Sequence, residues 1–204
     1  VEANNGKYHT LSFIWNFFVD LSAGSWWQTQ DGDVHSEGDL TSLIPSKASP
    51  RYLSLIGTGG VPGVVSYTGT LDLNEGYVSA NNWQAKTNYP RANTSGKINF
   101  TYLKNRLHVE GAGLGQTKAL PPGSPKDLPS QAGTYYVSEG FNLELNGGAI
   151  DGGKKIIIFV EDNLTLKSNI TVLEGSFFAL ITKGSLTFDG AVTQAQGFFL
   201  TDQT

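Results

Sequence analysis

Five polar side chains at every second position form the pattern that most resembles a metal-binding site. Asp31, Asp33, His35, Glu37 and Asp39 alternate with small or apolar residues. On an extended strand these five side chains point the same way, and carboxylate oxygens are ligands that Ca²⁺ accepts. Ligands along one straight strand rise by about 3.3 Å per residue, so they spread over more than about 10 Å. We therefore expect a solvated outer face, with Asp31 and Asp33 as the candidates for Ca²⁺ and no other cofactor.

The remaining motifs give little support to catalysis. The three histidines, His9, His35 and His108, are too dispersed to form the ligand spacing of a zinc site. The chain has no Gly-x-Ser-x-Gly nucleophile motif and no phosphate-binding glycine loop. We therefore predict that the protein is not an enzyme.

Cleavage of polysaccharides is the catalytic alternative, because it needs only two carboxyl groups. These groups must lie roughly 5–9.5 Å apart. Coils stacked on one another could bring together two of Asp31, Asp33, Asp162 and Asp189. Nothing in the sequence singles out a pair, so no catalytic residue is assigned.

Aromatic residues in polar surroundings are candidates for contact with sugars. Trp26, Trp27, Trp83 and Tyr89 fall in stretches that read as loops, and Trp83 stands among amide side chains. Such mixed polar and aromatic company is typical of a ligand site. The competing interpretation is that these rings cover the ends of the fold, because aromatic residues are buried more often than they bind ligands.

A repeat near the end of the chain predicts the elements that would position these residues. Three copies of one phrase are Asn142-Leu143-Glu144-Leu145, Asn163-Leu164-Thr165-Leu166 and Ser185-Leu186-Thr187-Phe188. Short strands at this period indicate coils that stack, with the first leucine of each copy above the next. The apolar runs that follow span residues 156–160, 177–181 and 198–200. The last run is short, so either the sequence is a piece of a longer chain or another element completes this edge.

The beginning of the chain predicts a long β-strand. Apolar residues occupy every second position: Leu11, Phe13, Trp15, Phe17, Val19 and Leu21. The strand could cover the core of its own molecule, which is the commoner case. The alternative is addition to a sheet edge of another copy, which would make these residues an assembly strand.

These patterns predict an organisation in three parts. Residues 1–25 are the N-terminal apolar strand, and residues 26–45 and 131–204 form the solenoid core. Residues 46–130 are an inserted β-rich excursion that ends in a proline-rich linker. Within it, Lys97 to Glu110 alternates between apolar and polar residues and is expected to form a β-hairpin.

Two phrases carry a resemblance to a known class of proteins. The first phrase spans residues 27–40 and reads Trp-Gln-Thr-Gln-Asp-Gly-Asp-Val-His-Ser-Glu-Gly-Asp-Leu. The second spans residues 160–166 and reads Val-Glu-Asp-Asn-Leu-Thr-Leu. They resemble uncharacterised bacterial cell-surface proteins with right-handed parallel β-helix segments. The resemblance covers about half of the chain. It implies an extracellular, surface-attached protein and brings no catalytic residues with it.

Composition narrows the classes of partner. The chain of 204 residues carries a formal net charge of −4, which argues against nucleic acid and against docking on an anionic membrane. It has no cysteine, 25 glycines and no apolar run long enough for a spanning helix.

We predict an all-β fold with a short parallel β-helix core. The expected function is a structural or adhesive module that could assemble into fibres through its N-terminal strand or open coil ends. The alternative is a module that binds or cleaves surface polysaccharide.

Overall fold

A computed structural model gives the structure of the chain. It describes residues 13–20, 24–36, 38–86, 98–111, 115–120, 125–138 and 142–202. At residues 13–20, 24–25 and 86 it describes the backbone alone. Nearly all described elements are strands, and they form a parallel β-solenoid of about seven turns. The predicted all-β solenoid fold is therefore confirmed.

The C-terminal part of the chain forms one stack of coils. One side of this stack consists of β10 (Thr117–Ala119), β11 (Gly133–Val137), β14 (Lys155–Val160), β17 (Phe177–Thr182) and β19 (Gln194–Thr201). The other two sides consist of β12 (Leu143–Leu145), β15 (Leu164–Leu166) and β18 (Leu186–Phe188), and of β13 (Gly148–Ile150) and β16 (Ile170–Val172). Neighbouring strands within each side are parallel. We call this unit the C-terminal stack.

The repeated leucines align as the sequence predicts. Leu143 pairs with Leu164, and Leu164 pairs with Leu186. Alternation along each short strand turns these leucines inward, and both Leu164 and Leu166 are fully buried in the core of the stack. The stacking follows from the period of the repeat, because copies spaced by one coil place identical side chains above one another.

The N-terminal part forms a second stack. One side consists of β2 (Gly24–Gln30), β5 (Tyr52–Leu55) and β8 (Tyr77–Ser79). The second consists of β3 (Val34–Ser36), β6 (Val65–Tyr67) and β9 (Gln84–Lys86). The third consists of β4 (Leu40–Thr41) and β7 (Leu71–Asp72). These strands also pair in parallel. Leu40 and Thr41, inside the predicted core segment 26–45, thus pair with residues of the expected excursion, and residues 52–86 supply two further coils. We call this unit the N-terminal stack.

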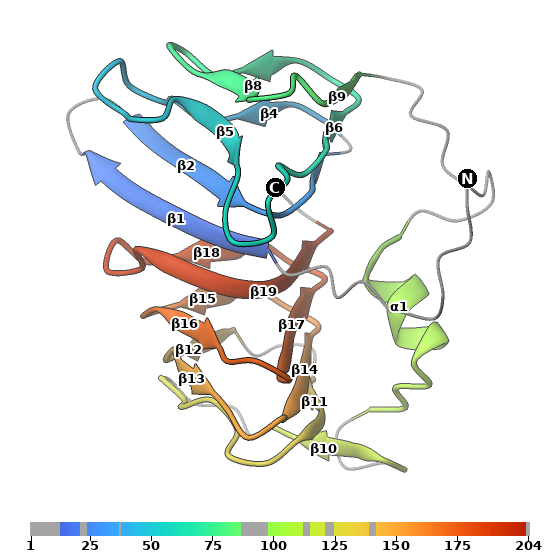
Figure 1. The fold of residues 1–204 in the computed structure, drawn as a ribbon. Coiled ribbons are helices and arrows are strands. Elements are labelled where there is room, and N and C mark those ends of the chain that lie inside the picture. The colour runs from blue at the N-terminus through green and yellow to red at the C-terminus, as the bar shows by residue number, and fades with distance from the viewer. Residues whose placement is uncertain are drawn as a thin grey trace, which may run out of the picture.

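Strand β1 (Phe13–Asp20) joins the two stacks (Figure 1). It pairs antiparallel with β2 on one edge and antiparallel with β19 on the other. The long sheet therefore runs in the order β10-β11-β14-β17-β19-β1-β2-β5-β8. In this arrangement β1 completes the edge of β19 within its own chain. Of the predicted assembly strand, Leu11 and Leu21 lie outside the described residues, and Phe13, Trp15, Phe17 and Val19 lie on β1.

The far end of the C-terminal stack is covered by residues of the proline-rich stretch and by Leu120 just before it. The backbone amide of Lys126 donates to the carbonyl of Glu144, and the carbonyl of Lys126 accepts from the amide of Asn146. Leu120 and Leu128 pack against the buried core. This end of the solenoid therefore has a cap, which protects the last coil from pairing with other strands.

The predicted hairpin at Lys97 to Glu110 is wrong, because residues Phe100–Arg106 form a helix, α1. The side chain of Asn99 caps its first turn by accepting a hydrogen bond from the amide of Tyr102 at 2.8 Å. Phe100 is buried and Leu103 is partly buried against the same cluster, so the apolar residues recur at helical spacing. The helix lies alongside the C-terminal stack (Figure 1).

Candidate functional site

The alternating polar residues from Asp31 to Asp39, which we call the acidic stripe, form hydrogen bonds between neighbouring coils. We call these contacts the joints between coils. Asp31 accepts hydrogen bonds from the amides of Gly57 at 2.8 Å and Gly59 at 2.7 Å, one with each carboxylate oxygen. Asp33 accepts from the amide of Val64 at 2.7 Å. In each case the amide belongs to the next coil. The two predicted Ca²⁺ candidates therefore use their carboxylates to bind the backbone of a neighbouring coil.

Asp39 repeats this arrangement one strand later. Its Oδ1 accepts from both the amide and the hydroxyl of Thr70, at 2.7 and 2.8 Å. The amide hydrogen bond lowers the pKa of Asp39, because it favours the charged form. His35 Nδ1 lies 2.8 Å from the hydroxyl of Ser66, and Glu37 lies outside the described residues. Among the residues that the structure describes, no three histidine or acidic side chains gather as metal ligands.

Close approach of the backbone explains the glycines that face these carboxylates. A Cβ atom on Gly57 would lie 2.4 Å from Asp31 Oδ2, and one on Gly69 would lie 2.3 Å from Asp39 Oδ1. Any larger residue would displace the carboxylate from the amide. The pattern of acidic residues and glycines in the N-terminal stack is thus a set of structural joints.

The carboxylates considered for sugar cleavage have separate partners in the C-terminal stack. Asp189 forms an ion pair with Lys167 Nζ at 2.5 Å, and this hydrogen bond lowers the pKa of Asp189. Asp162 accepts from the amide of its neighbour Asn163 at 3.2 Å. Asp31 and Asp33 lie in the other stack. No catalytic residue is assigned from these positions.

The predicted aromatic candidates differ in accessibility. Trp26 is buried in the core of the N-terminal stack. Trp27 is partly buried and its indole N–H donates to the carbonyl of Thr41 at 3.0 Å. Trp83 is 43% exposed, and Tyr89 lies outside the described residues. Trp83 is therefore the described candidate with a ring most open to solvent.

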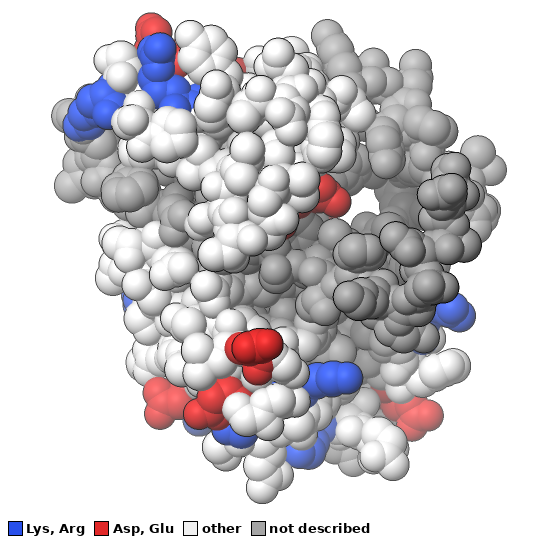
Figure 2. Space-filling view, viewed as in Figure 1, with Lys and Arg blue, Asp and Glu red and all other residues white. Residues whose placement is uncertain are grey.

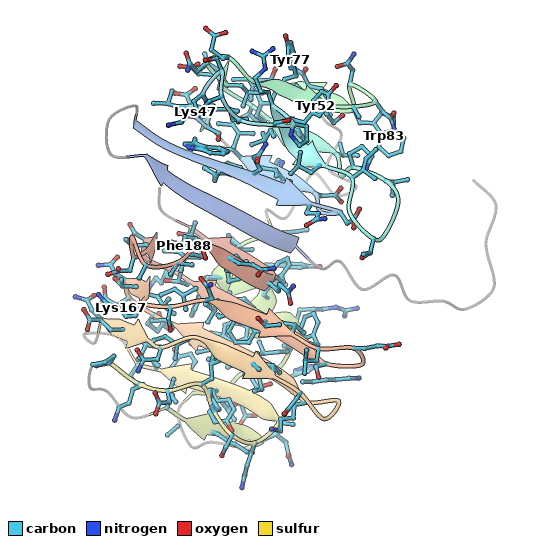
Figure 3. All side chains as sticks on the ribbon, turned by 60° about the vertical axis from the view of Figure 1, so that its left-hand side comes forward. Lys47, Tyr52, Tyr77, Trp83, Lys167 and Phe188 are labelled. Atoms are coloured by element: carbon cyan, nitrogen blue, oxygen red, sulfur yellow. The ribbon has the colours of Figure 1, made fainter. Side chains whose placement is uncertain are left out.

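A hollow that sequence reasoning missed lies at the end of the N-terminal stack on which no described coil packs. It is a shallow, open space of about 430 Å³, and its apolar lining residues are Leu71, Leu73 and Val78. Its polar lining includes Asp72, Asn74, Tyr77 and Asn82. Tyr77 is 53% exposed and lies at the end of the molecule remote from the C-terminal stack, while Trp83 points away on another side (Figure 3).

A second polar cluster holds α1 against the C-terminal stack. Glu161 accepts from Lys104 Nζ at 2.9 Å, from the hydroxyl of Tyr136, and from Lys183 Nζ at 3.2 Å. Lys104 Nζ also donates to the Tyr136 hydroxyl at 2.7 Å. These hydrogen bonds join α1 to the C-terminal stack, and we call this cluster the latch of α1.

Burial and hydrogen bonding oppose each other in this latch. Burial alone would raise the pKa of Glu161, but hydrogen bonds from Tyr136, Lys104 and Lys183 outweigh it and lower the pKa. Burial likewise would lower the pKa of Lys104, whereas its bonds to Tyr136 and Glu161 raise it. Burial, with the bond to Glu161, raises the pKa of Tyr136. At neutral pH the carboxylate and the ammonium group are therefore both charged.

The surface carries no broad field of one sign on the face shown in Figure 2. Basic and acidic side chains are interspersed at both ends, with wide uncharged areas between them. No described helix has the length and apolar character that crossing a membrane requires.

Family models, curated proteins and solved structures give no significant match to this chain. The class of protein is therefore defined by the fold itself, a β-solenoid of parallel coils in two stacks joined by an antiparallel strand.

Proposed function

We propose that the protein is a structural and adhesive module of an extracellular surface protein. The observation that carries this proposal is the use of its polar side chains. Asp31, Asp33 and Asp39 bind the backbone of the next coil, and Glu161 binds a helix to the coils. Side chains engaged in this way hold a shape and are poorly available for catalysis.

The arrangement of β1 supports the same role. A strand that pairs on both edges makes one continuous sheet out of two stacks, so force applied to one stack reaches the other through backbone hydrogen bonds. Such a sheet suits a spacer or a rigid carrier of a binding surface. Assembly of copies end to end is the fibre-forming version of this proposal, and it would use the open end of the N-terminal stack.

The localisation half of the proposal has a direct test in the cells that produce the protein. Antibodies raised against the purified chain are applied to intact cells and to lysed cells. We expect labelling of intact cells, and loss of that labelling after brief treatment with an external protease. Labelling that requires lysis would overturn the extracellular assignment.

The structural half is tested on the purified chain by light scattering and electron microscopy. A rigid monomer, or filaments with the width of a single solenoid, would each agree with a scaffold. An expanded chain without cooperative unfolding would contradict it.

A polysaccharide-binding module is the second candidate function. The observation that favours it is the polar hollow beside the exposed ring of Tyr77, at an end of the solenoid that no described coil covers. Binding of cell-wall polysaccharide to the purified chain, measured by co-sedimentation, would support this candidate.

A further inference from the structure

The end of the N-terminal stack on which no described coil packs leaves inward-facing side chains open to solvent. Leu40 and Leu53 are buried one coil further in, where Leu71 and Val78 lie above them in register. Leu71 and Val78 are themselves only half-buried, because no further described coil packs on them. They form the floor of the hollow of about 430 Å³, a volume within the range of small-molecule sites.

The rim of this hollow presents hydrogen-bonding groups that the fold leaves available. Asp72 uses Oδ1 to accept from the amide of Asn74 at 3.0 Å, and no bond within the described chain occupies Oδ2. The Asn82 side chain likewise has no hydrogen bond to any described residue, so it offers both a donor and an acceptor. Tyr77 adds an exposed aromatic ring, whose hydroxyl accepts a long hydrogen bond from Arg51 at 3.5 Å.

The charges around the hollow favour an uncharged ligand. Arg51 lies 4.0 Å from a carboxylate oxygen of Glu75, and its guanidinium stacks 5.3 Å from the centre of the Tyr77 ring. This cation is therefore engaged by Glu75 and by Tyr77, and the lining of the hollow carries the carboxylate of Asp72. An anion would meet that carboxylate without a free cation to balance it, and one carboxylate is too few for a metal ion.

We propose that this hollow is a binding site for a neutral saccharide. A pyranose ring has an apolar C–H face and an edge of hydroxyl groups, which match the floor of Leu71 and Val78 and the rim of Asp72 and Asn82. The Tyr77 ring borders the same space and gives the sugar an aromatic wall. This inference rests on the second candidate function and gives it a location that differs from Trp83.

The test is binding of the full chain to a printed array of neutral and N-acetylated oligosaccharides, followed by titration of the best probe. We expect Tyr77→Ala and Asn82→Ala each to weaken binding by about tenfold or more. The matched control is Tyr102→Ala, which removes a tyrosine of similar exposure, 45%, from α1. Far-UV circular dichroism and thermal unfolding show that each variant is folded.

The outcomes separate this site from the others. Unchanged affinity in Tyr77→Ala overturns the proposal, as does the absence of binding to any probe on the array at millimolar concentration. Loss of binding in Trp83→Ala but not in Tyr77→Ala places the saccharide elsewhere and leaves the second candidate function intact. A concentration-dependent dimer that Tyr77→Ala abolishes would show that a second copy occupies the hollow, and it would also overturn the saccharide site.

Discussion

Replacement of Leu166 by alanine is the sharpest perturbation of the stacked coils. Leu166 is fully buried and lies in register between Leu145 on one neighbouring strand and Phe188 on the other. The change removes three carbon atoms from a core whose neighbours on both sides are fixed by backbone pairing. At about 0.8 kcal/mol per buried methylene, plus the free energy of the cavity, we expect a loss of about 3 kcal/mol in the free energy of unfolding.

The matched control is Thr165→Ala on the same strand. Thr165 points outward between Glu144 and Thr187, so its loss leaves no cavity. The assay is equilibrium unfolding in urea, followed by far-UV circular dichroism, with thermal unfolding as a second readout. We expect Leu166→Ala to melt roughly 6–12 °C below the wild type. A difference of less than about 1 kcal/mol between the two variants would refute the stacked core at this position.

The remaining predictions concern the joints between coils and the latch of α1. Gly147→Ala should destabilise strongly, because its Cβ would lie 2.0 Å from the carbonyl of Asn169, while Gly190→Ala, with open space around it, should unfold like the wild type in urea. Asp31→Ala should increase proteolysis near residue 57, because the amides of Gly57 and Gly59 lose their acceptor; an unchanged cleavage pattern would count against the joint. The folded pKa of Glu161 is lowered from its ordinary 4.5, so its contribution is full above that value and is lost as pH falls through the folded pKa. The stability of the wild type should therefore fall more steeply than that of Glu161→Gln as the pH is lowered below 4.5, and equal slopes in a pH series of urea titrations would contradict the latch.

The C-terminal stack could be predicted from the sequence because its repeat is regular. The three phrases start 21 and 22 residues apart, and side chains at equal positions then fall above one another. The N-terminal stack has no such period. Leu40 and its partner Leu71 are 31 residues apart, whereas Val65 and its partner Gln84 are 19 residues apart. Loops of unequal length between the coils hide the repeat, so these coils read as an excursion.

Local alternation misled the prediction at α1. Ile98, Phe100 and Tyr102 alternate as a strand would, yet Ile98 and Tyr102 are exposed and Phe100 alone is buried. The cap by Asn99 and the packing of Phe100 against the C-terminal stack stabilise a helix here in place of a strand. Tertiary packing of this kind overrides a short period-two pattern.

The candidate hollow could not be read from the sequence for a related reason. Its floor consists of ordinary inward-facing residues, Leu71 and Val78, which differ from Leu40 and Leu53 only in having no described coil above them. Exposure at a coil end depends on where stacking stops. The acidic stripe, in contrast, was visible in the sequence, but its backbone partners lie in a different coil and appear only in the fold.

Disulfide cross-linking can show whether β1 joins the two stacks within one chain. The chain has no cysteine, so a pair introduced at Asn16 and Gln194, which lie opposite each other on β1 and β19, forms the only disulfide available. We predict a cross-linked monomer on non-reducing gels, with Asn16→Cys alone giving no internal bond. A cross-linked dimer or a ladder of higher species would show instead that β1 pairs with β19 of another copy.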